Sequence, residues 1–134
     1  MINKTRFRVG LNGKPGNLEA ILSEFGKEIY EVYAPCPSHI CPTARKVKMP
    51  LNEKEIAGQI KLAHKYSVRY NVLMNASCLS ARQFSKDFRD KILKFIKFIF
   101  IAGVDSITVV DPYLLKLIRG HFDIEIDVAG LKKQ

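Results

Sequence analysis

Cysteine and histidine side chains are grouped in two segments of the sequence, and these residue types could bind a metal. Cys36, His39 and Cys41 lie in "PCPSHIC", and Cys78 ends "NASC". Thiolate and imidazole are soft ligands, so Cys36, Cys41 and Cys78 are candidate ligands of zinc or of an iron–sulfur cluster. The spacing Cys-x4-Cys differs from the Cys-x2-Cys of structural zinc sites, so the identity of any cofactor stays open. Alternatively, Cys78 could be a small buried residue of the hydrophobic core.

Asn75, Cys78 and Asp111 are the candidate catalytic residues, because each follows an apolar segment that is typical of a buried strand. An asparagine amide donates and accepts hydrogen bonds, so it could orient a substrate carbonyl or a metal-bound water. A thiol reacts or ligates as the thiolate. Structural roles are open as well: Asn75 could cap a turn, and Asp111 before Pro112 is a good helix N-cap.

Other motifs argue against several common sites. The glycines of "GLNGKPG" do not fit the dinucleotide pattern G-x-G-x-x-G, and Lys14 is followed by Pro15 where a P-loop needs Ser or Thr. His64 falls on a predicted exposed helix face and His121 in a turn. No order of Ser, His and Asp and no pair of carboxylates indicates hydrolytic catalysis of a familiar type.

Hydrophobic periodicity predicts five strands that alternate with four helices. The strands are predicted at 6–11, 28–34, 69–74, 106–111 and 124–129, and the helices at 18–25, 52–66, 83–102 and 112–120. Asn17, Asn52 and Pro112 mark helix starts, and Gly103 marks a helix end.

A helix between every two strands predicts a parallel α/β sheet with its strands in sequential order. The unit length fits the first half of a TIM-type barrel or a small open doubly wound sheet. Without a linker-like segment, residues 1–134 are expected to form one domain. Parallel strands bring their carboxyl ends to one edge, where Asn12, Cys36, Asn75, Asp111 and Asp127 are then expected.

The net charge of +9 makes RNA or another polyanion a candidate partner. The basic residues are scattered, however, and a solvated surface is the preferred explanation. No apolar segment reaches the roughly 18 to 20 residues of a membrane span, so no membrane partner is expected. Without a recognisable secretory signal, three cysteines favour reduced thiols in the cytoplasm.

Four segments carry a resemblance to one family. They are "PGNLEAILSEFGKEIYEVY", "YNVLMNASCL", "AGVDSITVVDPYLLKLI" and "IEIDVAG". In order and spacing they resemble the collagenase-like bacterial peptidases of unassigned catalytic type, peptidase family thirty-two. The segment "APCPSHICPTARKVKMP" departs from the glycine-rich segment of that family.

The resemblance implies the N-terminal part of a TIM-like barrel. It also implies a protease-named family in which some members assist hydroxylation of RNA or of quinone precursors with an iron–sulfur cluster. The cluster cysteines of those members lie in a later part of the chain, so the resemblance assigns no cluster to Cys36, Cys41 or Cys78.

Three functions follow from these observations: part of an enzyme, a basic module that binds RNA or peptide, and an inactive remnant. A five-stranded part of a barrel leaves two open edges, and we expect its inner face to be lined by Val, Leu and Ile. Such a surface predicts a homo-oligomer or a complex with a chain that supplies the other part of the barrel.

Overall fold

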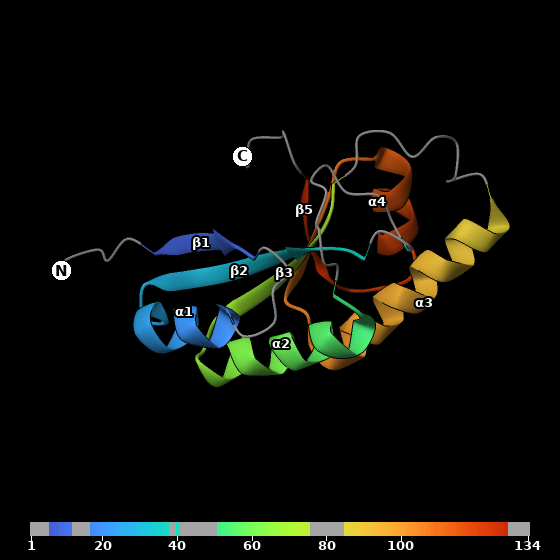
Figure 1. Cartoon of the computed structure of the whole chain (residues 1–134). Coiled ribbons are helices and arrows are strands. Elements are labelled where there is room, and N and C mark those ends of the chain that lie inside the picture. The colour runs from blue at the N-terminus through green and yellow to red at the C-terminus, as the bar shows by residue number, and fades with distance from the viewer. Residues whose placement is uncertain (1–5, 12–16, 38–39, 41–50, 76–84, 129–134) are drawn as a thin grey trace.

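The computed structural model describes residues 6–11, 17–37, 40, 51–75 and 85–128. Strands and helices alternate along the chain, as the sequence predicts (Figure 1). The elements are β1 (Phe7–Gly10), α1 (Asn17–Phe25), β2 (Ile29–Pro35), α2 (Glu53–Lys65), β3 (Arg69–Met74), α3 (Lys86–Ala102), β4 (Ser106–Val109), α4 (Pro112–Arg119) and β5 (Glu125–Val128).

The strands form one sheet in the order β1-β2-β3-β4-β5, and every neighbouring pair is parallel. Val9 pairs with Val32, and Val72 pairs with Ile107, which in turn pairs with Ile126. This arrangement confirms the predicted sequential parallel sheet. The described sheet ends at β1 and β5, so it is an open part of a barrel and is not closed.

Capping residues fix the starts of α2 and α4 as predicted. The Asn52 side chain accepts from the Glu55 backbone N–H (2.8 Å) and the Glu55 side chain accepts from the Asn52 N–H (3.2 Å), which completes a capping box. The start of α3 was predicted too early: Ser85 is extended and accepts from the Phe88 N–H, so the helix begins three residues later, at Lys86. Gly103, with φ +96°, ends α3 as expected.

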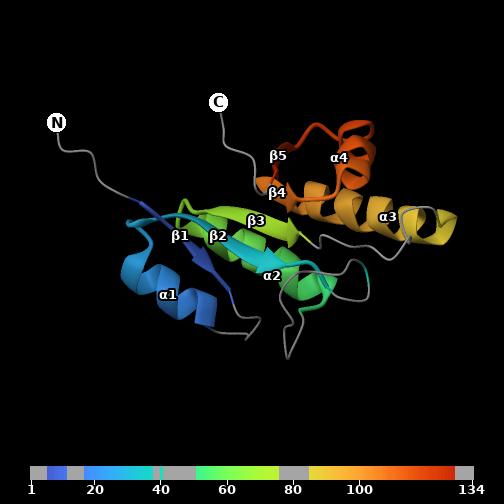
Figure 2. The same ribbon diagram turned by 90° about the horizontal axis from the view of Figure 1, so that it is seen from above.

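The helices cover one face of the sheet and build the core there. Figures 1 and 2 show α1, α2 and α3 along the same side of the strands. The Tyr70 hydroxyl donates to Gln59 of α2 (2.6 Å), which assigns Tyr70, and with it Val72 and Met74, to this covered face. On α3, Phe95 and the other side chains of the apolar stripe are almost fully buried in the same cluster. Among the helices in the described ranges, none is long and apolar enough to cross a membrane.

The opposite face of the sheet corrects one prediction. We expected Val, Leu and Ile to line it, but strand alternation places Glu31, Asn71, Ser106 and Thr108 there. The prediction assigned the valines and isoleucines of the strands to the wrong face, because side chains such as Val72 point to the helices. The open face is therefore polar at its centre.

Candidate functional site

The carboxyl ends of β2, β3 and β4 lie at one edge of the sheet because the strands are parallel. The backbone N–H of Cys36 donates to the Leu73 carbonyl (2.9 Å), which fixes the end of β2 beside β3. The pairing of β3 with β4 extends to the last residue of each strand, and Asn75 and Asp111 come just after these ends. The structure therefore brings Cys36, Asn75 and Asp111 to one edge, which we call the carboxyl rim.

Asp111 is the N-cap of α4. Its Oδ1 accepts from the backbone N–H groups of Tyr113 (2.9 Å) and Leu114 (3.0 Å), and Pro112 occupies the first helical turn. These bonds satisfy two of the N–H groups that have no partner inside the helix. The N-cap interpretation is confirmed, and a catalytic role of Asp111 stays a prediction.

The predicted metal ligands fall largely outside the described residues. Cys41, Cys78 and His39 lie there, while Cys36 is a buried thiol, 3% exposed, within the hydrophobic cluster. Within the ranges that the structure describes, no three side chains of His, Cys, Asp or Glu are grouped closely enough to hold a metal ion. The assignment of Cys36, Cys41 and Cys78 to a metal stays a prediction.

Buried polar side chains occupy the centre of the open face. Glu31 is 2% exposed, Asn71 1% and Ser106 0%. A buried carboxylate is costly unless hydrogen bonds and opposite charges replace its water. Each of these side chains must therefore have partners, and the structure supplies them.

Hydrogen bonds connect these side chains, and two further ones, across four neighbouring strands. Ser106 Oγ donates to Glu31 Oε2 (3.0 Å), and Asn71 Nδ2 donates to Ser106 Oγ (2.7 Å). Thr108 Oγ1 donates to Asn71 Oδ1 (2.9 Å), and Asn71 Nδ2 also lies 3.4 Å from Asp127 Oδ2 of β5. We call these five residues the polar network.

Two arginines neutralise the buried carboxylate of the polar network. Arg69 Nε lies 3.4 Å from Glu31 Oε2, and Arg8 Nε lies 3.7 Å from Glu31 Oε1. Arg69 also bonds the Glu125 carboxylate. Burial by itself lowers the pKa of Arg69, but Glu125, Tyr30 and Glu31 hold that pKa above its ordinary value. The guanidinium therefore remains charged at every working pH.

The two groups of polar residues differ in what they can do. Members of the polar network bond to one another, so the network holds β2, β3, β4 and β5 in register instead of presenting an open group to a ligand. The carboxyl rim follows the strand ends, where loops and helix N-termini meet in parallel α/β folds. The rim is accordingly the candidate site for a substrate.

Comparisons with known proteins agree with this architecture. No protein-family model matches the chain. An alignment over 116 residues, which covers 84% of the chain, is 32% identical to the uncharacterized protease MJ1657 of Methanocaldococcus jannaschii. The fold is similar to the solved U32 peptidase Mk0906, with a TM-score of 0.72 over 96% of this chain and 17% identity. The chain is thus similar in sequence to a protein named as a protease and similar in fold to a U32 peptidase. The resemblance seen in the sequence motifs is thereby confirmed.

The chain is shorter than both relatives. It spans about a third (33%) of MJ1657 and half (50%) of the solved U32 peptidase chain. Its fold is also similar to that of a hypothetical protein from Ruminiclostridium thermocellum, with a TM-score of 0.59, 10% identity and coverage of 90% of this chain and 96% of that chain. The chain therefore corresponds in fold to part of the solved U32 peptidase, and its described sheet of five strands is open.

Sequence reasoning about this chain missed two features. His64 is exposed as expected, but its partner was not foreseen: His64 Nε2 lies 2.7 Å from Asp105 Oδ2, which also accepts from the Tyr70 N–H (2.8 Å). Glu31 and Asn71 were not singled out either. The signal was present: each is a lone polar residue in the middle of an apolar strand, in "YEVYA" and "RYNVLM".

Proposed function

We propose that this chain is a member of the U32 peptidase family and carries the substrate-binding rim of a protein that hydrolyses peptides, with Asn75, Cys78 and Asp111 as the catalytic residues. The observation that carries the proposal is the 32% identity to a protein named as a protease over 84% of this chain. The common edge formed by Cys36, Asn75 and Asp111 supports it, because active sites of parallel α/β barrels lie at the carboxyl ends of the strands. In this proposal the Asn75 amide orients the substrate carbonyl without titrating.

A second part of the barrel belongs to the proposal. Strands β1 and β5 are the edges of a described sheet of five strands, whereas a closed TIM-type barrel has eight. Backbone N–H and C=O groups at such edges are suited to pair with another strand. We therefore propose that a complementary chain, or another copy of this one, completes the rim.

The proposed location is the cytoplasm, where the three thiols stay reduced. An iron–sulfur cluster or zinc, and a role in RNA modification, remain further proposals for this family member. Of the proposed ligands only Cys36 belongs to the described residues, where it packs in the hydrophobic cluster.

RNA binding without catalysis is the second candidate function. The net charge of +9 favours it, and α3 presents exposed lysines at positions 91, 94 and 97. These lysines follow one another at intervals of three residues, so they lie near one another on the helix surface. Phosphate contacts of this kind are independent of sequence and weaken steeply with salt.

Peptide cleavage by the purified chain tests the proposed function against this alternative. Labelled casein and short peptides are incubated with the wild-type chain and with the Asn75→Ala and Asp111→Asn variants, and products are read by mass spectrometry. Asn is as good an N-cap as Asp, so Asp111→Asn keeps α4 capped and removes only the charge. We expect cleavage by the wild type and its loss in both variants.

Binding measurements cover the case in which cleavage needs the second part of the barrel. Peptide titration is followed through the backbone amide signals of Cys36, Asn75 and Asp111, beside an RNA mobility-shift assay at low salt. Shifts at the rim with peptide support the proposal. A rim unaffected by peptide, together with salt-sensitive RNA binding, contradicts it in favour of the second candidate.

A further inference from the structure

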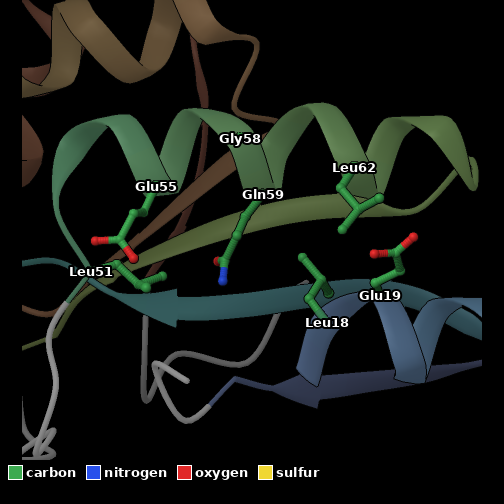
Figure 3. A pocket seen from close by; sticks show the side chains of 7 residues that line it. All are labelled: Leu18, Glu19, Leu51, Glu55, Gly58, Gln59 and Leu62. Carbon is green, nitrogen blue, oxygen red and sulfur yellow. The ribbon is translucent and has the colours of Figure 1, made fainter. Parts of the chain in front are cut away.

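A groove between α1 and α2 has a volume of about 230 Å³ and lies on the helical side of the sheet, away from the polar network. We call it the α1–α2 groove. Figure 3 shows the residues that line it, which are Leu18, Glu19, Leu51, Glu55, Gly58, Gln59 and Leu62. Small-molecule sites typically measure about 300–1,000 Å³, so this volume suits one or two side chains of a partner better than a whole cofactor.

The α1–α2 groove has an apolar floor. Leu18 and Leu51 are 2% and 7% exposed, and Leu62 is half-buried beside them. Figure 3 shows Leu18 of α1 facing the α2 side chains across the groove. An aliphatic side chain placed between these leucines would leave water, which favours binding in proportion to the apolar area covered.

Gly58 keeps this groove open. A Cβ atom added at this position would meet nothing within 4 Å, so no steric contact requires glycine here. Glycine inside a helix costs about 0.5–1 kcal/mol relative to alanine. Position 58, in the lining of the groove, thus leaves out a side chain that the helix would accommodate.

Acidic side chains stand at both ends of the groove, with an amide between them. Figure 3 shows Glu55 near Leu51 at one end and Glu19 at the other, and the Gln59 amide nitrogen directed into the groove. Gln59 Oε1 already accepts from the Tyr70 hydroxyl (2.6 Å), which leaves its N–H groups as donors for a ligand. In a chain of net charge +9, two carboxylates around an apolar floor are a local exception.

We propose that the α1–α2 groove is a docking site for a peptide segment of a partner protein in which an aliphatic side chain is flanked by lysine or arginine. The aliphatic side chain packs on the leucine floor, and the basic side chains lie at Glu19 and Glu55. The Gln59 N–H groups donate to a backbone carbonyl of the segment. Charge favours this partner, because the two carboxylates at the groove attract its basic side chains.

A nuclear magnetic resonance titration tests the docking site. The probe is the peptide Ala-Lys-Leu-Lys-Ala, and the readout is the backbone amide shifts of Leu18, Gly58 and Leu62 in the wild-type chain. Two matched peptides, Ala-Glu-Leu-Glu-Ala and Ala-Lys-Ser-Lys-Ala, remove the positive charge or the aliphatic side chain. We expect saturable shifts at the groove with the first peptide only.

Substitutions in the groove separate binding from stability. Gly58→Leu fills the groove with a good helix former, so we expect unchanged or higher stability and a loss of affinity of about ten-fold or more, the value of one buried aliphatic side chain. Glu55→Gln keeps the capping box, since Gln also accepts from the N-cap N–H. Combined with Glu19→Gln, it should weaken binding about three-fold per carboxylate. The matched control is Glu24→Gln, exposed on α1 and outside the groove.

Three results overturn the docking site: equal binding of the serine peptide, unchanged affinity in Gly58→Leu, and an effect of Glu24→Gln as large as that of Glu19→Gln. The titration needs no catalysis and no rim residue. A negative titration at the groove would therefore not contradict the proposed peptide hydrolysis. Likewise, a negative cleavage or binding result at the rim would not contradict the docking site.

Discussion

The two faces of the sheet come from alternate residues of the same strands, yet different forces hold them. On the covered face, Val72 and Ile107 are fully buried against helix side chains. On the open face, Asn71 and Ser106 are just as buried but bond to other polar side chains. The covered face is stabilised by close packing of apolar side chains, and the open face by hydrogen bonds between polar side chains. Burial alone therefore does not tell which kind of residue a position accepts.

The largest effect is expected on the covered face. Ile107→Ala should lower the free energy of unfolding by about 3 kcal/mol, because it removes buried carbons from a packed cluster and leaves a cavity. Denaturant unfolding measures the change. Ile101→Ala is the control, since Ile101 is 74% exposed and should change stability by less than about 0.5 kcal/mol. Similar losses in both variants would contradict the assignment of the core to this face.

The open face is tested by two carboxylates that share Arg69. Glu31→Ala should cost about 2 kcal/mol, because Ser106 and Arg69 lose a buried, charged acceptor. Glu125→Ala should cost only about 0.5 kcal/mol, because the Glu125 side chain is 51% exposed while that of Glu31 is 3% exposed. Chemical denaturation of both variants gives the comparison. Equal costs would show that the polar network does not depend on burial.

A smaller effect is expected for Tyr70 on the covered face, and this effect should depend on pH. Tyr70→Phe removes the hydrogen bond to Gln59 and should cost about 1 kcal/mol at pH 7. Burial raises the pKa of Tyr70 above its ordinary value of about 10. Above pH 10 the unfolded wild type loses the phenol proton and the folded wild type keeps it, so wild-type stability falls by about 1.4 kcal/mol per pH unit.

The phenylalanine variant lacks this loss, so the stability difference between the two proteins should close and then reverse as the pH rises above 10. Lysine titration contributes equally to both proteins and cancels. Denaturation at pH 7 and at intervals between pH 9 and 11 measures the difference. A difference that stays constant over this range would mean that the Tyr70 phenol ionises alike in both states.

Most of the fold was predictable because its signals are local. A helix between each pair of strands dictates parallel pairing, and Asn52, Asp111 and Gly103 mark helix ends through their own residue types. The start of α3 was misplaced because the apolar spacing runs across it, and only the cap at Ser85 locates it.

The candidate site was predictable only as a set of strand ends. Their common edge follows from parallel order, so Cys36, Asn75 and Asp111 could be placed together. The polar network was missed because its meaning depends on pairs distant in sequence. Glu31 lies 75 residues from Ser106, and nothing near Glu31 in the sequence shows that this hydroxyl will reach it.

The sequential order of the strands has a consequence for how the sheet opens. Each strand pairs only with the strands that precede and follow it in the chain. Disruption at β1 or β5 therefore removes one ladder, whereas disruption at β3 divides the sheet into two separate pairs. Amide protons of β3 should exchange with solvent most slowly and those of the two edge strands fastest. The central position of β3 thus makes it the strand on which cooperative unfolding of the whole sheet depends.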